Sequence, residues 1–143
     1  MTQSVKATVA DKVLLELPDL ARKLKAFPFP GVDVVVGVGT GGIVPASLVA
    51  YELERPLYII QLNYRAPDNT PQRSEPELLS PFVLMGSQRV LLVDDVCVTG
   101  QTLTRAKESL TGHSVTSFVL KGRADLVLLP DLGSCIALPW RDF

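Results

Sequence analysis

The feature that most constrains this chain is an apolar run that ends on two adjacent carboxylates, within Arg89–Leu103 (RVLLVDDVCVTGQTL). Residues 90–93 are all Val or Leu, a pattern typical of a strand that is buried on both faces of a parallel sheet. Asp94 and Asp95 then stand at the carboxyl end of that strand, where open α/β sheets bind their ligands. We therefore expect an α/β fold with a ligand site at this edge of the sheet.

Hydroxyl-bearing residues and a glycine follow the two acids. Thr99, Gly100, Gln101 and Thr102 lead into a helical pattern over 103–110. Backbone N–H groups at the start of a helix bind anions, and neighbouring hydroxyls add further donors. Acids that can hold sugar hydroxyls or a metal ion thus lie within a few residues of a phosphate site. This combination indicates a sugar phosphate as the ligand.

A second glycine-rich turn follows another apolar strand, Val32–Val38. It consists of Gly39, Thr40, Gly41 and Gly42. We interpret it as a second anion site, because its glycines let backbone N–H groups approach a pyrophosphate. The stretch also satisfies G-x-G-x-x-G, the pattern of a dinucleotide-binding turn. That alternative requires an acid about 20 residues later to hold a ribose, whereas the next strand ends in Gln-Leu-Asn at 61–63.

The remaining apolar segments complete an alternation of strands and helices. Helical spacing covers 19–26 and 43–53, and strands are expected at 57–62 and 115–120, with short strands at 126–129 and 136–138. This order predicts a mostly parallel sheet flanked by helices, in one domain over residues 1–143. Residues 64–80 are polar and contain prolines, and we expect a flexible loop there, since long loops in compact domains are usually functional or mobile.

Composition argues against several classes of function. The 143 residues carry a net charge of −1, so no basic field predicts a nucleic-acid partner. No apolar run approaches the roughly 20 residues of a membrane span, and the first residues lack the apolar core of a signal peptide. Cys97 and Cys135 form neither a metal motif nor a disulfide framework. The sequence therefore predicts a cytoplasmic protein without a nucleic-acid or membrane partner.

Together these motifs resemble the type I phosphoribosyltransferases over nearly the whole chain. Val93–Thr102 (VDDVCVTGQT) matches the signature that binds phosphoribosyl pyrophosphate (PRPP). Residues 38–42 stand in the place of the pyrophosphate loop, which in that family often contains a non-proline cis peptide. The pair at 63–64, Asn-Tyr, resembles the start of the mobile catalytic loop. Ser117–Arg123 (SFVLKGR) and the terminal Pro-Trp at 139–140 resemble the small bacterial and archaeal enzymes that act on 6-oxopurines.

The resemblance implies a Mg²⁺-dependent transferase that moves ribose 5-phosphate from PRPP to a nucleobase, a 6-oxopurine, and releases pyrophosphate. It implies a small hood built from the two termini, and a homodimer or higher homo-oligomer. Asp94 and Asp95 would be the catalytic residues and would hold the ribose hydroxyls and Mg²⁺. The other implied roles are the 5′-phosphate site (Val96, Cys97, Val98, Thr99, Gly100, Gln101, Thr102), the pyrophosphate site (Gly39, Thr40, Gly41, Gly42), the flexible loop (Asn63, Tyr64, Arg65) and the base site (Lys121, Ile136, Trp140).

Two positions depart from the family pattern. Hypoxanthine-guanine enzymes carry an acid just before the Thr-Gly of the signature, where it takes a proton from the purine. This chain has Val98 there, which cannot accept a proton, as is also the case in the adenine, orotate and pyrimidine-operon regulatory branches. Small xanthine-guanine enzymes stack an aromatic on the purine several residues before the terminal Trp, where this chain has Gly-Ser-Cys-Ile at 133–136. The sequence thus leaves open a catalytically weak or inactive regulator of the same fold.

Overall fold

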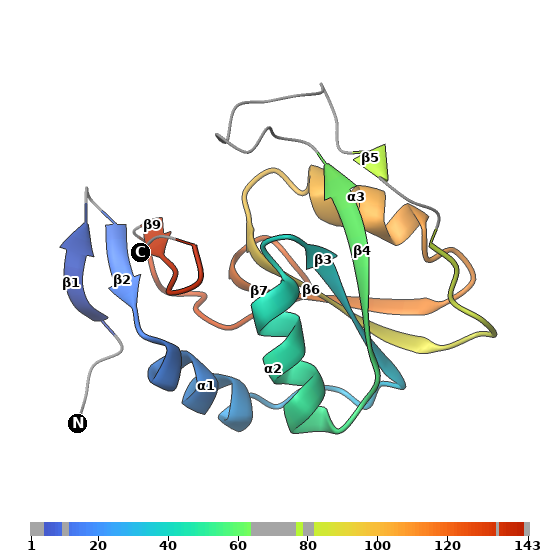
Figure 1. The fold of residues 1–143 in the computed structure, drawn as a ribbon, viewed down its shortest axis with the longest axis horizontal. Helices are drawn as coiled ribbons and strands as arrows, with labels where there is room; N and C mark the ends of the chain where they lie inside the picture. Colours follow the sequence, from blue (N-terminus) through green and yellow to red (C-terminus); the bar gives the residue numbers. More distant parts are fainter. Residues whose placement is uncertain (1–4, 10–11, 64–76, 79–81, 134, 142–143) are drawn as a thin grey trace.

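The computed structural model describes residues 5–9, 12–63, 77–78, 82–133 and 135–141, which form two sheets and three helices (Figure 1). A six-stranded sheet has the order β5-β4-β3-β6-β7-β8, and a three-stranded sheet has the order β1-β2-β9. The strands are β1 (Val5–Val9), β2 (Lys12–Leu15), β3 (Val34–Gly39), β4 (Leu57–Asn63), β5 (Glu77–Leu78), β6 (Arg89–Cys97), β7 (Ser114–Gly122), β8 (Leu126–Val127) and β9 (Cys135–Ala137). The helices are α1 (Leu17–Ala26), α2 (Ile43–Leu53) and α3 (Gln101–Glu108).

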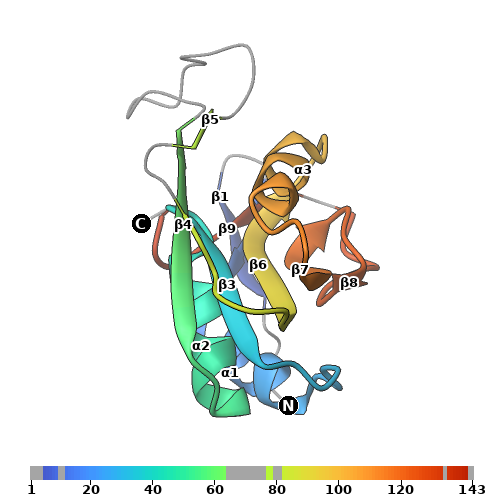
Figure 2. The ribbon, with the colours of Figure 1, turned by 90° about the vertical axis from the view of Figure 1, so that its right-hand side faces the viewer.

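The larger sheet is mostly parallel, as the sequence predicts. Strands β4, β3, β6, β7 and β8 run parallel to one another, and among the described residues of this sheet only the pairing of β5 with β4 is antiparallel. Figure 2 shows these five parallel strands side by side in that order. The fold is that of an α/β protein whose helices cover the sheet.

The central strands have long apolar runs because helices cover both faces of the sheet. Side chains of alternate residues on a strand point to opposite faces. Accordingly, Leu91 and Val93 of β6 pack in one core cluster with Val49 of α2. Leu92 packs in a second cluster with Leu103 of α3. The uninterrupted Val-Leu run at 90–93 is therefore the expected sequence of a strand between two cores.

The two ends of the chain meet in the smaller sheet. Strand β2 pairs in parallel with β9, so that Val13 lies opposite Ile136 and Leu14 opposite Ala137. In Figure 1 this sheet stands beside the larger one, with the blue N-terminal and red C-terminal strands adjacent. We call β1, β2 and β9 the hood. The hood predicted from the resemblance is confirmed.

Element boundaries differ from the predicted ones at a few places. Strand β6 continues to Cys97, so Asp94 and Asp95 lie inside it rather than after it. Helix α3 begins at Gln101 and ends at Glu108, two residues earlier than predicted at each end. Strand β1 was not predicted, because it becomes a strand only through its pairing with β2. Within the described residues, no helix is both long and apolar enough to cross a membrane.

Candidate functional site

The site lies where β3 and β6 separate. Their pairing ends with Gly37 opposite Val93, whereas the pairing of β6 with β7 continues to Cys97 opposite Gly122. From β3 the chain crosses through α2 to β4 on one side, and from β6 it crosses through α3 to β7 on the other. Such a switch point opens a crevice at the carboxyl ends of the two strands. Asp94 and Asp95 are the first residues of β6 beyond its last pair with β3.

The two carboxylates are buried and are held by their own backbone. Asp94 and Asp95 are 7% and 5% exposed. The Asp95 N–H donates to Asp94 Oδ1 at 2.8 Å, and the Val96 N–H donates to Asp95 Oδ1 at 2.6 Å. Burial raises the pKa of Asp94 well above its usual range, and the neighbouring Asp95 charge raises it further. The pair is thus oriented before any ligand binds, although burial and mutual repulsion disfavour the charged form of Asp94.

The glycine-rich turn after β3 packs directly on Asp95. A Cβ built on Gly41 would lie 2.6 Å from Asp95 Oδ2, so only glycine lets the turn approach this closely. The peptide bond between Gly39 and Thr40 is cis, as the resemblance implies. The Gly42 N–H is already donated to Val38 O at 2.7 Å. Gly42 therefore supports the turn, and Gly41 is the member that faces Asp95.

The expected phosphate turn connects β6 to α3. Gly100 precedes the helix with φ +91°, and the Gln101 N–H donates to Thr99 Oγ1 at 3.3 Å. The first N–H groups of a helix lack partners within the helix, and this end of α3 follows the acid pair by a few residues. Val98 is 76% exposed beside it, whereas Cys97 is buried. Burial raises the pKa of the Cys97 thiol, which is consistent with a structural filler.

The residues expected to contact a base lie in different surroundings. Lys121 stands on β7 opposite Val96 and is half-buried. Ile136 is 4% exposed in the core beneath the hood, and Trp140 packs against the same core from the C-terminal turn. Trp140 Nε1 is buried and has no hydrogen-bond partner among the described residues. Asn63 ends β4, while Tyr64, Arg65 and most of the predicted loop 64–80 lie outside the described residues.

Sequence reasoning missed one residue at the site. Arg141 reaches from the C-terminal turn, and its Nη1 donates to Asp95 Oδ2 at 3.0 Å. A single arginine close to the chain end carries no pattern in the sequence. Its position after Trp140, which the resemblance had linked to the site, was the available signal.

The donors present fit a metal ion that arrives with a phosphorylated substrate. Asp94 and Asp95 supply carboxylate oxygens, and the described residues contain no group of three or more His, Cys, Asp or Glu that could enclose a metal. Mg²⁺ is usually bound through one or two carboxylates together with substrate phosphates and water. The acid pair and the adjoining anion-binding turns match that arrangement.

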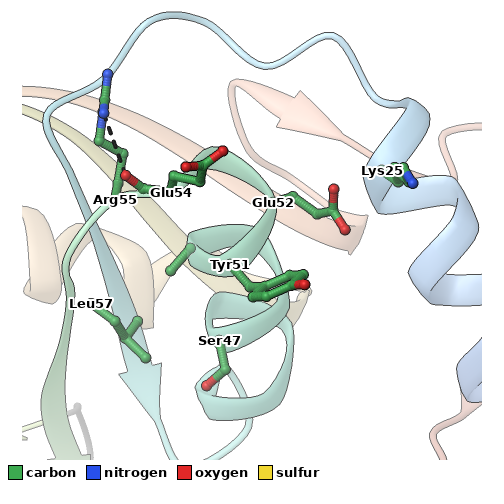
Figure 3. A pocket seen from close by; sticks show the side chains of 8 residues that line it. Lys25, Ser47, Tyr51, Glu52, Glu54, Arg55 and Leu57 are labelled. Carbon is green, nitrogen blue, oxygen red and sulfur yellow. Dashed lines mark hydrogen bonds between the residues drawn. The ribbon is translucent and has the colours of Figure 1, made fainter.

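A surface pocket lies at the other end of the sheet (Figure 3). It is bordered by the last turns of α2 and by Lys25 of α1, with Tyr51 and Glu52 projecting from the helix. Leu57, which also lines it, pairs with Val35 near the start of β3. The acid pair lies at the opposite, carboxyl end of β3, so this pocket is separate from the candidate site.

Comparison with known proteins agrees with this geometry. The chain is similar to an adenine phosphoribosyltransferase of Marinomonas sp., with 34% identity over 100 residues that cover 64% of this chain and 53% of the relative. A transcriptional regulator GfcR of Thermoplasma acidophilum is 34% identical over 80 residues, 56% of this chain and 37% of the relative. An orotate phosphoribosyltransferase of Sulfurisphaera tokodaii is 30% identical over 106 residues, which cover 72% of this chain and 49% of the relative. The chain thus spans about half or less of these curated relatives.

A solved structure matches over almost its whole length. It is a purine phosphoribosyltransferase from Pyrococcus horikoshii, with a TM-score of 0.68 and 26% identity over 93% of this chain and 96% of that one. The family model described as a phosphoribosyl transferase domain matches residues 17–121. That range contains the acid pair, both glycine-bearing turns and four of the six strands of the larger sheet in full. Sequence, fold and site geometry thus agree that the chain belongs to the phosphoribosyl transferase family.

Proposed function

We propose that this protein transfers the ribose 5-phosphate group of PRPP to a purine base and releases pyrophosphate. The observation that supports this most is the packing of the Gly41 turn on the buried Asp95, where β3 and β6 separate. One ligand with a ribose between two phosphate groups can use the acid pair, this turn and the start of α3 together. The Pyrococcus structure, which matches along nearly its full length, is named a purine enzyme.

The proposed reaction is a displacement at C1 of the ribose. A bond forms between C1 and a base nitrogen, the bond from C1 to the pyrophosphate oxygen breaks with its electron pair leaving on pyrophosphate, and the base nitrogen loses its proton. Asp94 and Asp95 hold the ribose hydroxyls and orient C1 toward the base. Mg²⁺ bound with PRPP would neutralise charge on the leaving pyrophosphate, and the acid pair would hold it.

For the base we propose a 6-oxopurine. Lys121 stands on β7 beside the acid strand, and its ammonium group can donate to an exocyclic oxygen. Val98 offers no carboxylate to take the proton, so the base nitrogen would pass it to water or to pyrophosphate. Adenine is the competing substrate, because relatives named adenine phosphoribosyltransferase match this chain.

A second candidate function is a regulator that binds PRPP or a nucleotide without turnover. Two observations favour it: Val98 in place of an acid, and the matches to proteins named transcriptional regulator GfcR. Incubation with labelled PRPP, Mg²⁺ and each of hypoxanthine, guanine, xanthine, adenine and orotate separates the candidates. A nucleotide formed with any base excludes the regulator-only function, whereas PRPP binding without product from any base supports it.

Asp95→Asn tests the site itself. We expect it to weaken PRPP binding in the presence of Mg²⁺ by at least about 30-fold, because a charge-assisted contact worth roughly 2–3 kcal/mol is lost from a buried position. Isothermal titration calorimetry measures the affinity. Asp33→Asn, at the amino end of the sheet near Arg89, is the matched control and should bind like the wild type. Equal affinity of Asp95→Asn and wild type would refute the site, and no PRPP binding by the wild type would refute the function.

A further inference from the structure

In the structure, Arg141 forms an ion pair with Asp95 of the acid pair. Its Nη1 lies 3.0 Å from Asp95 Oδ2, with the Asp95 side chain 7% exposed and the Arg141 side chain 47% exposed. One partner is therefore buried, while the other reaches in from the surface. A charge-assisted bond to a buried carboxylate is stronger than an ion pair between two exposed side chains.

The turn that carries Arg141 is anchored to the hood. The Arg141 N–H donates to Leu138 O at 3.1 Å, and Leu138 is fully buried. Trp140 packs against the same core, and β9, just before the turn, pairs with β2. The guanidinium is thus delivered by packed structure, and the hood is what brings it to β6.

The two oxygens of Asp95 have different partners. Oδ1 accepts the Val96 N–H, whereas Oδ2 accepts Arg141 and is the oxygen nearest to Gly41 of the glycine-rich turn. A cation that joins the acid pair to a pyrophosphate in that turn would need the same oxygen. Two cations at contact distance from one oxygen repel each other, so Arg141 and such a cation exclude one another.

We propose that Arg141 is the resident counter-ion of the acid pair and leaves Asp95 when a divalent cation binds there with its phosphorylated substrate. This inference rests on the proposed function, because that function supplies the cation. Arg141 stabilises the ligand-free protein by compensating two adjacent buried carboxylates, and it weakens the binding of a free cation. The cation is then held well only when the substrate brings further oxygen ligands.

The test measures Mn²⁺ binding to the full chain without PRPP, by electron paramagnetic resonance of free Mn²⁺. We expect Arg141→Gln to bind Mn²⁺ about fivefold more tightly than the wild type, because the competing charge is gone. Arg141→Lys retains the charge and should return the affinity most of the way to that of the wild type. Arg89→Gln removes a guanidinium paired with Asp33 at the far end of β6, and should change nothing.

The outcomes separate this inference from the proposed function. Unchanged or weaker Mn²⁺ binding by Arg141→Gln overturns the counter-ion role, whether or not the wild type binds PRPP. The same comparison in the Asp95→Asn background provides a second measurement: Arg141→Gln should change Mn²⁺ affinity clearly less there than in the wild type, because its contact with Asp95 is already gone. A fivefold effect that persists without Asp95 would also overturn the inference.

Discussion

Asp94 and Asp95 place two carboxylates side by side in a buried position, which opposes folding in the absence of a ligand. Burial is the main cause of the raised pKa of Asp94, and the charge of Asp95 adds to it. When the folded-state pKa of an acid exceeds the unfolded value, the folded protein binds the proton more tightly. Stability is therefore gained as the pH falls through the folded value, and the charged Asp94 costs stability above it.

Asp94→Asn should consequently stabilise the ligand-free protein at neutral pH, while it impairs PRPP binding. We expect a gain of about 1–2 kcal/mol, measured as the midpoint of thermal unfolding across a pH series. The gain should shrink as the pH approaches the ordinary Asp value of about 3.9. Asp33 is a control of opposite sign: a hydrogen bond from the Arg89 side chain lowers its pKa to about 2, so Asp33→Asn should destabilise the protein at neutral pH. A lower unfolding midpoint for Asp94→Asn at pH 7 would contradict this account.

Some residues have a local sequence pattern that predicts their role, and others do not. Asp94 and Asp95 were identified because a strand and a helix start flank them in the sequence. His113, next to Gly112, has the pattern of a solvated loop residue. In the structure its Nδ1 accepts the Gln88 N–H and its Nε2 pairs with Leu84 O, each at 3.0 Å. Like the contact of Arg141 with Asp95, these bonds join segments far apart in the chain, and no local pattern encodes them.

At the scale of elements, two adjacent glycines in the turn after β3 have different roles. Gly41 lies against a side chain of the site, and Gly42 lies against the backbone of two strands. A Cβ on Gly41 would meet the end of the Asp95 side chain, which can move. Gly41→Ala should fold with little loss of stability and bind PRPP at least about tenfold more weakly, because the carboxylate is displaced. A Cβ on Gly42 would lie 2.6 Å from Val93 O and 2.7 Å from Val38 O, which are backbone atoms of β6 and β3.

Gly42→Ala should therefore act on the fold first, with a loss of about 1–3 kcal/mol from forced separation of the two strands. Urea denaturation reports the stability of both variants, and calorimetry with PRPP reports binding. Gly41→Ala bound to PRPP as tightly as the wild type would show that the turn does not need to touch Asp95. Gly42→Ala of unchanged stability would show that β3 and β6 can separate freely.

Elements with a self-contained pattern were predictable from the sequence. Helix α2 has the predicted bounds, 43–53, because its apolar spacing and the Pro at 45 in its first turn are local signals. Strand β6 was predicted to stop at the acids, since its apolar run ends there, yet it continues to Cys97. The extension comes from its pairing with β7, in which Val96 lies opposite Lys121. Pairing between distant strands fixed this boundary.

At the scale of the whole molecule, the order of strands and helices was enough to predict the parallel sheet, since right-handed crossovers leave few alternatives. The hood was implied by the resemblance alone. Its strands are short, and β2 meets β9 only after the chain has passed through the whole larger sheet. The C-terminal turn with Arg141 follows β9 directly, so this late pairing also helps to place Arg141 at the acid pair.

Leu138 links the packing of the hood to the acid pair, and Leu138→Ala should reveal that link. Leu138 is fully buried and Leu24 of α1 is 2% exposed, so alanine at either position should cost about 2–5 kcal/mol. The Leu138 side chain packs in the core directly before the turn that carries Arg141, so Leu138→Ala, which keeps the carbonyl but removes that side chain, should loosen the C-terminal turn. We expect it to tighten Mn²⁺ binding toward the value for Arg141→Gln, while Leu24→Ala leaves it unchanged. Circular dichroism at low temperature confirms that both variants are folded. Equal Mn²⁺ affinities in the two leucine variants would mean that the hood stabilises the fold without controlling the charge at the acid pair.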